Sequence, residues 1–279
     1  MRSILTQNRL LWYNNRMKIL ITAGGTSERI DDVRRITNSG TGRLGAKIAE
    51  SFAAGVQGSA ITYICSENAA RPSAEICRGG ALDVRVTEGV DSVEAAVRKA
   101  CAQTAFDVIV HSMAISDYQV RAVSDSSLMT QNVLGSLPLL TRGDQPSAEA
   151  IVREALLSAP GIRENKISSD KDDLIVVLKR APKIIALLRG LAPDAVITGF
   201  KLLSGAGEEE LARVGHALLV KNDCDLVFAN DAGKVQGDRH EGILIARDGS
   251  YERASGKDGI AALIAERVKG LLIEKGRLY

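Results

Sequence analysis

Short apolar runs alternate with segments of helical periodicity along most of this chain, and this alternation limits the possible folds more than any other feature. The expected strands are Ile19–Thr22, Ala60–Cys65, Val84–Thr87, Asp107–Ser112, Leu174–Leu178, Val196–Phe200, Leu226–Ala229 and Ile243–Ala246. The expected helices are Gly42–Ala54, Val90–Gln103, Ala148–Ser158, Pro182–Leu191, Glu208–Lys221 and Gly259–Glu274. Such an alternation is typical of a mostly parallel sheet with helices on both faces. The sequence therefore predicts an α/β, Rossmann-like fold with ligands bound where the strands end.

The 279 residues suffice for one large α/β domain or two small ones, and we expect residues 17–279 to form a single Rossmann-like domain. The alternation breaks down between about 119 and 172, where polar clusters dominate. Irregular stretches of that length are uncommon in compact domains unless they have a function. We interpret this stretch as a flap or dimer-facing arm; a mobile surface excursion is the alternative. Because Met17 directly precedes the first strand, residues 1–16 are expected to be a poorly ordered extension.

Composition argues against several classes of protein. The net charge is only +2 and aromatic residues make up 4% of the chain, so we expect no nucleic-acid partner. No apolar run approaches the roughly 20 residues that span a bilayer, so no membrane partner is expected either. The cysteines lack zinc-ligand spacing, which favours structural thiols and a cytoplasmic protein; they are Cys65, Cys77, Cys101 and Cys224.

Two glycine-rich turns lie between the first strand and the first helix, at Ala23–Ser27 and Asn38–Gly45. Glycine lets the main chain approach a ligand closely, and the first N–H groups of a helix attract anions. We therefore expect a phosphate-bearing ligand here. The intervening residues 28–37 are too charged for a core strand, and we interpret them as a loop that carries side chains into the site.

The second turn also contains Gly40-x-Gly42-x-x-Gly45, which matches the dinucleotide-binding fingerprint, and Glu67 resembles the ribose-binding acid. In that fingerprint the first glycine follows strand one directly, whereas here Gly40 comes long after Thr22. The Tyr-x-x-x-Lys pair of small reductases is absent from the sequence. An NAD(P)-dependent reductase therefore stays as an alternative function.

Other polar or aromatic residues follow predicted strands and helices. Asp117 follows the strand Asp107–Ser112, where a carboxylate can hold magnesium bound to nucleotide phosphates, although a turn or helix cap is the simpler role. Lys166 and Lys221 could contact phosphates or merely carry solvated charges. Phe200 offers a ring that could stack on a base, or that packs in the core.

Taken together, these segments resemble the phosphopantothenate–cysteine ligase family, most closely its free-standing bacterial form. The segments that carry the resemblance are Ile19–Thr26, Asp31–Asn38, Gly40–Gly45, His111–Tyr118, Lys166–Ser169, Pro182–Ile185, Gly199–Lys201, Lys221–Asn222 and Ala229–Asp231. Their order is far more specific than any one of them. The resemblance covers roughly 17–275 and is poor across 123–160.

The resemblance implies a reaction in coenzyme A biosynthesis that joins 4′-phosphopantothenate to cysteine. In this family the carboxylate attacks the α-phosphate of CTP, giving an acyl-cytidylate and pyrophosphate, and cysteine then displaces CMP. CTP is the implied co-substrate and Mg²⁺ the implied metal. A homodimer is implied as well, with a separate phosphopantothenoylcysteine decarboxylase acting next. Members that use ATP share the same core, so the nucleotide stays open.

The resemblance also assigns roles to residues. Asn38 and Lys166 match catalytic positions. Substrate-binding positions match Gly24, Gly25, Arg34, Asn38, Gly42 and Ala114. Nucleotide-binding positions match Asp117, Lys166, Pro182, Lys183, Ile184, Ile185, Phe200 and Lys221, with Asp117 meeting Mg²⁺ through the triphosphate. One departure is Ala217, where a lysine is usual, and this leaves a non-catalytic nucleotide-binding regulator as a further alternative.

Overall fold

The structure is a computed structural model that describes residues 16–56, 58–138, 147–158, 161–162, 164–237 and 239–278. These residues form two compact units. The first contains the described residues up to Thr26, Asn38–Ile115 and those from Lys183 onward, and the second contains Ser27–Thr37 and the described part of Ser116–Pro182. The predicted N-terminal extension lies outside the described residues, apart from Arg16.

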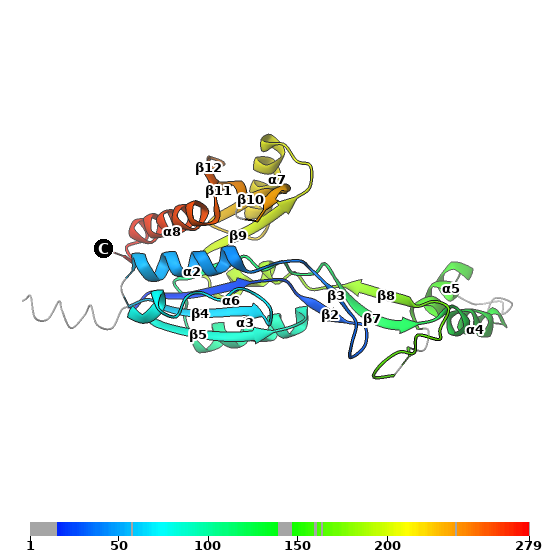
Figure 1. The fold of residues 1–279 in the computed structure, drawn as a ribbon. Coiled ribbons are helices and arrows are strands. Elements are labelled where there is room, and N and C mark those ends of the chain that lie inside the picture. Colours follow the sequence, from blue (N-terminus) through cyan, green and yellow to red (C-terminus); the bar gives the residue numbers. More distant parts are fainter. Residues whose placement is uncertain are drawn as a thin grey trace, which may run out of the picture. The chain divides into compact units, whose positions relative to one another are not determined.

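An eight-stranded sheet forms the centre of the first unit, in the order β12-β11-β10-β9-β6-β1-β4-β5 (Figure 1). Its strands are β1 (Lys18–Ala23), β4 (Ala60–Ser66), β5 (Ala81–Thr87), β6 (Val108–His111), β9 (Val196–Leu203), β10 (Leu226–Gln236), β11 (Arg239–Ala246) and β12 (Tyr251–Ser255). Neighbours from β5 to β10 are parallel, and β11 and β12 add two antiparallel strands at one edge. The predicted α/β, Rossmann-like fold is confirmed.

The strand order reverses next to β1, at the centre of the parallel part of the sheet. From β1 the chain continues to β4 and β5 on one side and then returns to β6 on the other. β1 and β6 pair in parallel from Ile19↔Val108 to Thr22↔His111. Ligands of open α/β sheets bind at such a reversal, beyond the carboxyl ends of the strands. The residues that follow Ala23 and His111 therefore occupy the expected ligand position.

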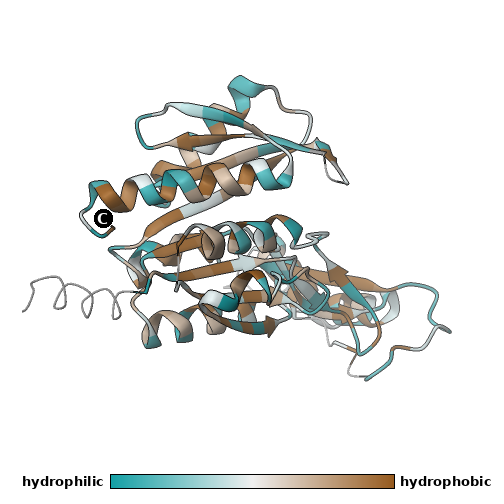
Figure 2. Ribbon diagram, turned by 60° about the vertical axis from the view of Figure 1, so that its left-hand side comes forward, coloured by the Kyte–Doolittle hydropathy of each residue, from teal (hydrophilic) through white to brown (hydrophobic). Residues whose placement is uncertain are grey.

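Helices cover both faces of this sheet. They are α2 (Arg43–Gly55), the short 3₁₀ helix η1 (Ile76–Gly79), α3 (Val90–Gln103), α6 (Ile185–Leu191), α7 (Glu208–Lys221) and α8 (Lys257–Glu274). Phe52 of α2 and Ile264 of α8 belong to one core with Phe228, whereas α7 packs over the neighbouring Ala229 on the opposite face. Figure 2 shows hydrophobic colouring concentrated on the strands and mixed along the helices, as expected for amphipathic helices on a buried sheet.

The second unit consists of two antiparallel strand pairs and two helices. The hairpin β2 (Ser27–Arg29) and β3 (Arg35–Thr37) is one pair, and β7 (Tyr118–Ser124) with β8 (Ile175–Arg180) is the other. The helices α4 (Ser126–Ser136) and α5 (Ala148–Leu157) follow β7 in the chain. The predicted arm at 119–172 lies within this unit.

Three sequence expectations about this unit were wrong in detail. The run Leu174–Leu178 does not join the central sheet, because β8 pairs with β7 in a separate two-stranded sheet. Residues 28–37 are not entirely loop, since their ends form the exposed hairpin β2–β3. The stretch 119–172 contains a strand and an unpredicted helix as well as α5. Apolar periodicity does not identify a strand's partner, and three-residue strands are too short to show a period.

Candidate functional site

The first glycine-rich turn extends the ladder between β1 and β6 beyond both strands. Gly24 has φ +91°, a conformation that favours glycine. Gly25 forms a parallel bridge with Ala114. The Ala114 N–H donates to the Gly24 carbonyl at 2.8 Å, and the Thr26 N–H donates to the Ala114 carbonyl at 3.2 Å. The predicted substrate-binding residues Gly24, Gly25 and Ala114 therefore lie together at the strand-order reversal.

The second glycine-rich turn packs directly on the first through main-chain atoms. The Asn38 N–H donates to the Thr26 carbonyl at 3.0 Å, and the Asn38 carbonyl accepts from the Gly40 N–H at 2.8 Å. A Cβ atom on Gly25 would overlap the Asn38 carbonyl oxygen, and one on Gly40 would overlap the Gly24 carbonyl. Only glycine permits this close approach at both positions. As a result Asn38, the predicted catalytic residue, is held beside Gly24 and Gly25.

The helix α2 begins directly after this turn, at Arg43. Its N-cap, Gly42, has φ +71° and supplies no side-chain cap, and the first turn contains no acidic residue. Several N–H groups at the start of α2 therefore lack an intrahelical partner, and the positive end of the helix dipole lies beside the glycine turns. This is the arrangement that binds phosphate or carboxylate groups in other proteins.

The end of β4 and the loop after it support both turns, through residues that the sequence analysis did not single out. The Ser66 hydroxyl accepts from the Gly25 N–H at 3.3 Å. The Tyr63 hydroxyl donates to the Ala70 carbonyl at 2.9 Å, and the Ala70 N–H donates to the Thr41 carbonyl at 2.9 Å. Burial raises the pKa of Tyr63, so its hydroxyl stays protonated as a donor. The position of Ser66 at the end of a predicted strand was the one available signal.

The end of β6 is fixed by hydrogen bonds to β1. His111 Nδ1 lies 2.8 Å from the Thr22 hydroxyl, and the Ser112 hydroxyl donates to the Thr22 carbonyl at 2.7 Å. Burial lowers the pKa of His111 to about 4, so the imidazole is neutral at physiological pH. His111 thus positions the strand end and is not a cation for phosphate.

In the second unit, the buried carboxylate of Asp31 joins two segments that are far apart in the sequence. Its oxygens accept from the Arg34 N–H at 2.6 Å, the Arg34 guanidinium at 2.9 Å and the Ile167 N–H at 3.2 Å. The Arg34 guanidinium also donates to the Ile167 carbonyl at 3.3 Å. The hydrogen bond from the Arg34 N–H is the main cause of a lowered pKa at Asp31, and burial opposes it. Asp31 is therefore ionised and holds Arg34 in place.

This network also fixes the backbone around Lys166. The Asp32 N–H donates to the Asn165 carbonyl at 2.8 Å, and Ile167 is bound by Asp31 and Arg34 as described. Lys166 lies between these two anchored residues, and it is exposed. The Arg34 side chain keeps 39% of its surface exposed, so it can also reach a ligand. The structure thus brings together Arg34 and Lys166, two predicted site residues from separate segments.

Asp117 belongs to the second unit and lies just before β7. It is exposed, and its carbonyl accepts from the Ala181 N–H at 3.0 Å, which joins the first residues of β7 to the end of β8. Among the described residues there is no group of three or more His, Cys, Asp and Glu side chains that could hold a metal ion. A lone carboxylate suits a magnesium ion that takes its other ligands from phosphates and water.

The residues predicted to cradle the nucleoside lie at the start of α6, in the segment just before it, and on β9. α6 starts at Ile185, later than predicted, and the Ile185 side chain packs on Gly199 so closely that a Cβ there would meet it at 2.9 Å. The half-buried ring of Phe200 packs at 5.7 Å on the buried ring of Phe228. Lys183 and Ile184 precede α6 in the first unit, whereas Pro182 is the last residue of the second.

Lys221 lies apart from the glycine turns. It is the last residue of α7, which connects the parallel strands β9 and β10. Such a connection returns the chain to the edge where the strands begin, whereas the glycine turns lie at the carboxyl edge. Asp231 lies in β10 and is buried. It accepts hydrogen bonds from the Gly205 and Gly233 N–H groups, so it stabilises the loop between β9 and α7 that contains Gly205.

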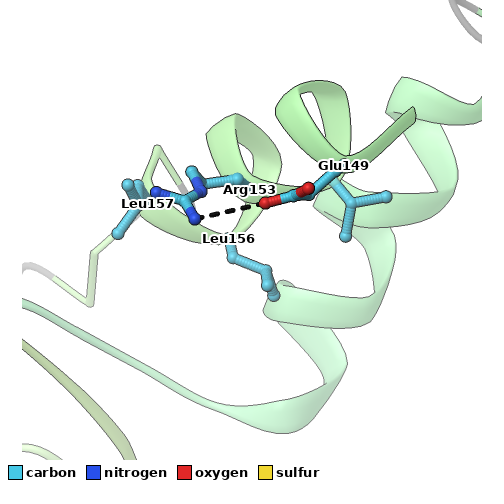
Figure 3. Close-up of a pocket in the computed structure, with 5 residues that line it drawn as sticks. Glu149, Arg153, Leu156 and Leu157 are labelled. Atoms are coloured by element: carbon cyan, nitrogen blue, oxygen red, sulfur yellow. Dashed lines mark hydrogen bonds and ion pairs between the residues drawn. The ribbon is translucent and has the colours of Figure 1, made fainter. Parts of the chain in front are cut away.

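A separate hollow of about 300 Å³ lies on the surface of α5 (Figure 3). Its lining includes Leu156, Leu157 and an ion pair between Glu149 and Arg153 at 3.3 Å. All lining residues belong to this one helix, and the two charged groups neutralise each other. The hollow therefore offers no catalytic group. It is a feature of the surface of the arm, to which α5 belongs.

Comparisons with known proteins agree on one group of relatives. Residues 15–144 match the family model described as the DNA/pantothenate metabolism flavoprotein C-terminal domain. The coenzyme A biosynthesis bifunctional protein CoaBC of Thermococcus kodakarensis is 26% identical over 231 residues, which cover 83% of this chain and 45% of that protein. The chain spans about half the length of the curated CoaBC relatives that it matches.

Solved structures extend this similarity to the fold. The crystal structure of the DNA/pantothenate metabolism flavoprotein from Streptococcus pneumoniae is 29% identical, with a TM-score of 0.72, and covers 91% of this chain and 99% of that one. A Cab2 mutant in complex with phosphopantothenate-cysteine is 18% identical, with a TM-score of 0.63 over 96% of this chain and 92% of that one. At that identity the Cab2 similarity shows a common fold. Within the described part of this chain, no helix has the length and apolarity needed to cross a bilayer.

Proposed function

Because this chain is a relative of the phosphopantothenate–cysteine ligases, as its sequence predicted, we propose that it joins 4′-phosphopantothenate to cysteine with CTP as co-substrate. The carboxylate forms a bond to the α-phosphorus of CTP while pyrophosphate leaves with the electron pair of the broken P–O bond. The amine of cysteine then attacks the acyl carbon, and CMP leaves. The product, 4′-phosphopantothenoylcysteine, is a substrate for a separate decarboxylase. We place the reaction in the cytoplasm.

The observation that carries this proposal is the main-chain packing of the two glycine turns at the carboxyl end of β1. The turns present Asn38 beside the uncapped start of α2, so amide donors and a positive helix end converge. Both steps develop negative charge on oxygen, which preorganised donors stabilise by roughly 3 kcal/mol each. The dinucleotide alternative lacks such support, since Gly24 and not Gly40 follows β1 directly.

Asn38 is the proposed donor to the acyl oxygen. Its N–H and carbonyl both bond within the turns, so its backbone is held in place at the glycine turns. Gly24, Gly25, Gly42 and Ala114 let the substrate approach the main chain closely.

The resemblance gives charged groups of the second unit roles of their own. Arg34 pairs with substrate phosphate or carboxylate, while Lys166 neutralises phosphate charge. Asp117 would hold Mg²⁺ on the triphosphate, and that ion would supply further neutralisation of its charge. Lys183, Ile184, Ile185 and Phe200, with Pro182, contact the nucleoside. Lys221 remains a proposed phosphate contact from the resemblance alone.

Product analysis tests the activity. The protein is incubated with phosphopantothenate, cysteine, Mg²⁺ and CTP, and we expect CMP and pyrophosphate in equal amounts. Without cysteine, pyrophosphate should stop near one equivalent per site, because the acyl-cytidylate has no acceptor. A parallel reaction with ATP decides the nucleotide. Absence of both products with either nucleotide contradicts the proposed ligase function. A change in NADPH or NADH fluorescence on binding would then favour the alternative of a reductase.

We also propose a homodimer formed through the arm. The helices α4 and α5 leave leucines exposed, with Leu134 at 56%, Leu137 at 42% and Leu156 at 42%. Leu156 lines the hollow in Figure 3 together with the Glu149–Arg153 pair. Exposed apolar side chains on neighbouring helices favour a protein–protein contact.

Light scattering with size-exclusion chromatography tests the dimer. Wild-type protein should elute at twice the mass of the 29.7 kDa chain, and Leu156→Lys should shift the protein toward the monomer. Ile273→Lys is the matched control, because Ile273 is 55% exposed but lies on α8. A wild-type monomer, or equal shifts in both variants, contradicts the proposal.

A further inference from the structure

A groove of about 660 Å³ lies between the first turns of α2 and α8, within the first unit. The two helices pack side by side (Figure 1), and residues 70–71 and 255–259 complete the lining. β12 runs in the same direction as β10, because two antiparallel steps separate them, so α8 starts at the carboxyl edge as α2 does. The groove therefore lies at the ligand edge of the sheet, and its volume suits a small molecule.

The charged side chains of this groove leave an excess of positive charge. They are Arg43, Lys47, Arg71, Lys257, Glu50 and Asp258. Lys47 is held by Glu50 at 3.4 Å and by Asp258 at 3.2 Å, so its charge is already balanced. Arg43 and Arg71, by contrast, form no ion pair with any residue that the structure describes. Two guanidinium groups thus line a cavity without a carboxylate partner.

The helix ends add to this positive potential. α2 and α8 have the N-caps Gly42 and Gly256, and neither cap supplies a side-chain acceptor. The first turn of α2 contains no acidic residue, whereas Asp258 lies in the first turn of α8, so the positive end of the α2 dipole is the one that adds to the arginines at this groove. An anion with several charged oxygens is the ligand that satisfies both sets of donors.

The groove is continuous with the glycine turns. Gly42 ends the second turn and caps α2, and a Cβ there would meet Ala69 at 2.8 Å. The Ala70 N–H donates to the Thr41 carbonyl at 2.9 Å, so the turn and the groove share one wall. A molecule whose α-phosphate lies at the glycine turns can extend its further phosphates along this wall.

We propose that this groove binds the β- and γ-phosphates of the nucleoside triphosphate, and the pyrophosphate that they become, with Arg43 and Arg71 as binding residues. The inference rests on the proposed function for its ligand. It also adds cations at the carboxyl edge of the sheet, where Lys221 does not lie and where Ala217 stands in place of the lysine that the resemblance leads us to expect.

Titration calorimetry of the full chain with CTP, CMP and pyrophosphate tests the groove. Arg43→Gln and Arg71→Gln should each weaken binding of CTP and of pyrophosphate roughly tenfold, because each removes a charge-assisted hydrogen bond. Binding of CMP, which lacks these phosphates, should change less than about twofold. Arg71→Lys, which keeps the charge, should retain part of the affinity. Arg213→Gln, an exposed arginine of α7 that is 74% accessible, is the matched control and should have no effect.

The outcomes separate this inference from the proposed function. If wild-type protein forms CMP and pyrophosphate but both arginine variants bind pyrophosphate normally, the groove assignment alone is wrong. Equal weakening of CMP and CTP also overturns it. If the variants lose pyrophosphate affinity but wild-type protein forms no product, the groove assignment is supported and the proposed ligase function is wrong. A wild-type protein that binds neither CTP nor pyrophosphate overturns both.

Discussion

Asn38 is the residue on which the chemistry depends most. Its main chain bonds to Thr26 and Gly40, so removing the carboxamide should not disturb the turns. We expect Asn38→Ala to lower kcat by about 10²- to 10³-fold, the usual loss for one oxyanion donor, while the CTP affinity stays unchanged. Rapid-quench analysis should show that the acyl-cytidylate forms or decays slowly.

The neighbouring residue Ser39 provides the control, because it is exposed and lies in the same turn. Ser39→Ala should keep normal turnover and the same melting temperature as wild-type protein. Normal amide formation by Asn38→Ala would contradict the role assigned to Asn38.

The ionisation of Asp31 makes the stability of the folded protein depend on pH. Hydrogen bonds from Arg34, Val33 and Ile167 outweigh burial and lower its pKa below the ordinary value of an aspartate. A carboxylate whose pKa is lower in the folded than in the unfolded state stabilises the fold at pH values above its unfolded-state pKa. This stabilisation is lost as the pH falls through the folded-state pKa. Wild-type protein should therefore melt higher than Asp31→Asn at pH 5–7, and the difference should shrink below about pH 4.

Thermal melts at stepwise pH measure this effect, and Asp32→Asn is the matched control. Asp32 is 62% exposed and lies 3.9 Å from Arg29, so its loss should change little at any pH. Asp31→Asn should also raise the KM for phosphopantothenate, because Arg34 and Lys166 lose their anchor. A pH-independent difference would show that titration of Asp31 does not contribute.

At the scale of elements, Arg189 joins α6 to the start of β10. Its guanidinium donates to the Asp225 carboxylate at 2.7 Å and to the Asp223 carbonyl at 2.8 Å, and Asp225 also binds the Ile197 N–H. We expect Arg189→Ala to lower the free energy of unfolding by about 2–3 kcal/mol, because it leaves a largely buried carboxylate with Lys275 as its remaining cation.

Urea denaturation gives this value, and Arg98→Ala is the control. Arg98 forms an exposed i,i+4 pair with Glu94 on α3, which is worth about 0.3–0.5 kcal/mol. Equal losses in the two variants would contradict a special role for Arg189 in holding α6, and with it Ile185, against the sheet.

At the scale of the whole molecule, the two units differ in how much core they contain. The strands β1 and β6 of the first unit are almost fully buried, whereas β8 leaves Leu178 at 42% exposure. Segments with little buried apolar surface open more readily than the global core. Hydrogen-exchange mass spectrometry should therefore show faster exchange in 118–137 and 175–180 than in 18–23 and 108–111. Similar protection in both sets would mean that the molecule opens as one cooperative unit.

The sequence alone determined seven of the eight strands of the central sheet and its long helices, because each depends on a local pattern, whereas β12 was not predicted. β1 and α3 were predicted almost to the residue, since a buried parallel strand and an amphipathic helix both have strong periodicity. The glycine turns were also visible in the sequence, as their backbone requirement belongs to single residues. The resemblance to the ligase family followed from the order of short motifs.

Only the tertiary structure decided which distant segments meet. Asp31 binds Ile167 across a separation of 136 residues, and no local pattern of either segment indicates that contact. The same reason explains why Leu174–Leu178 was placed in the wrong sheet, and why Arg43 and Arg71 were not recognised as neighbours in one groove. Local propensity fixes elements, whereas pairing and charge balance depend on what the folded chain brings close together.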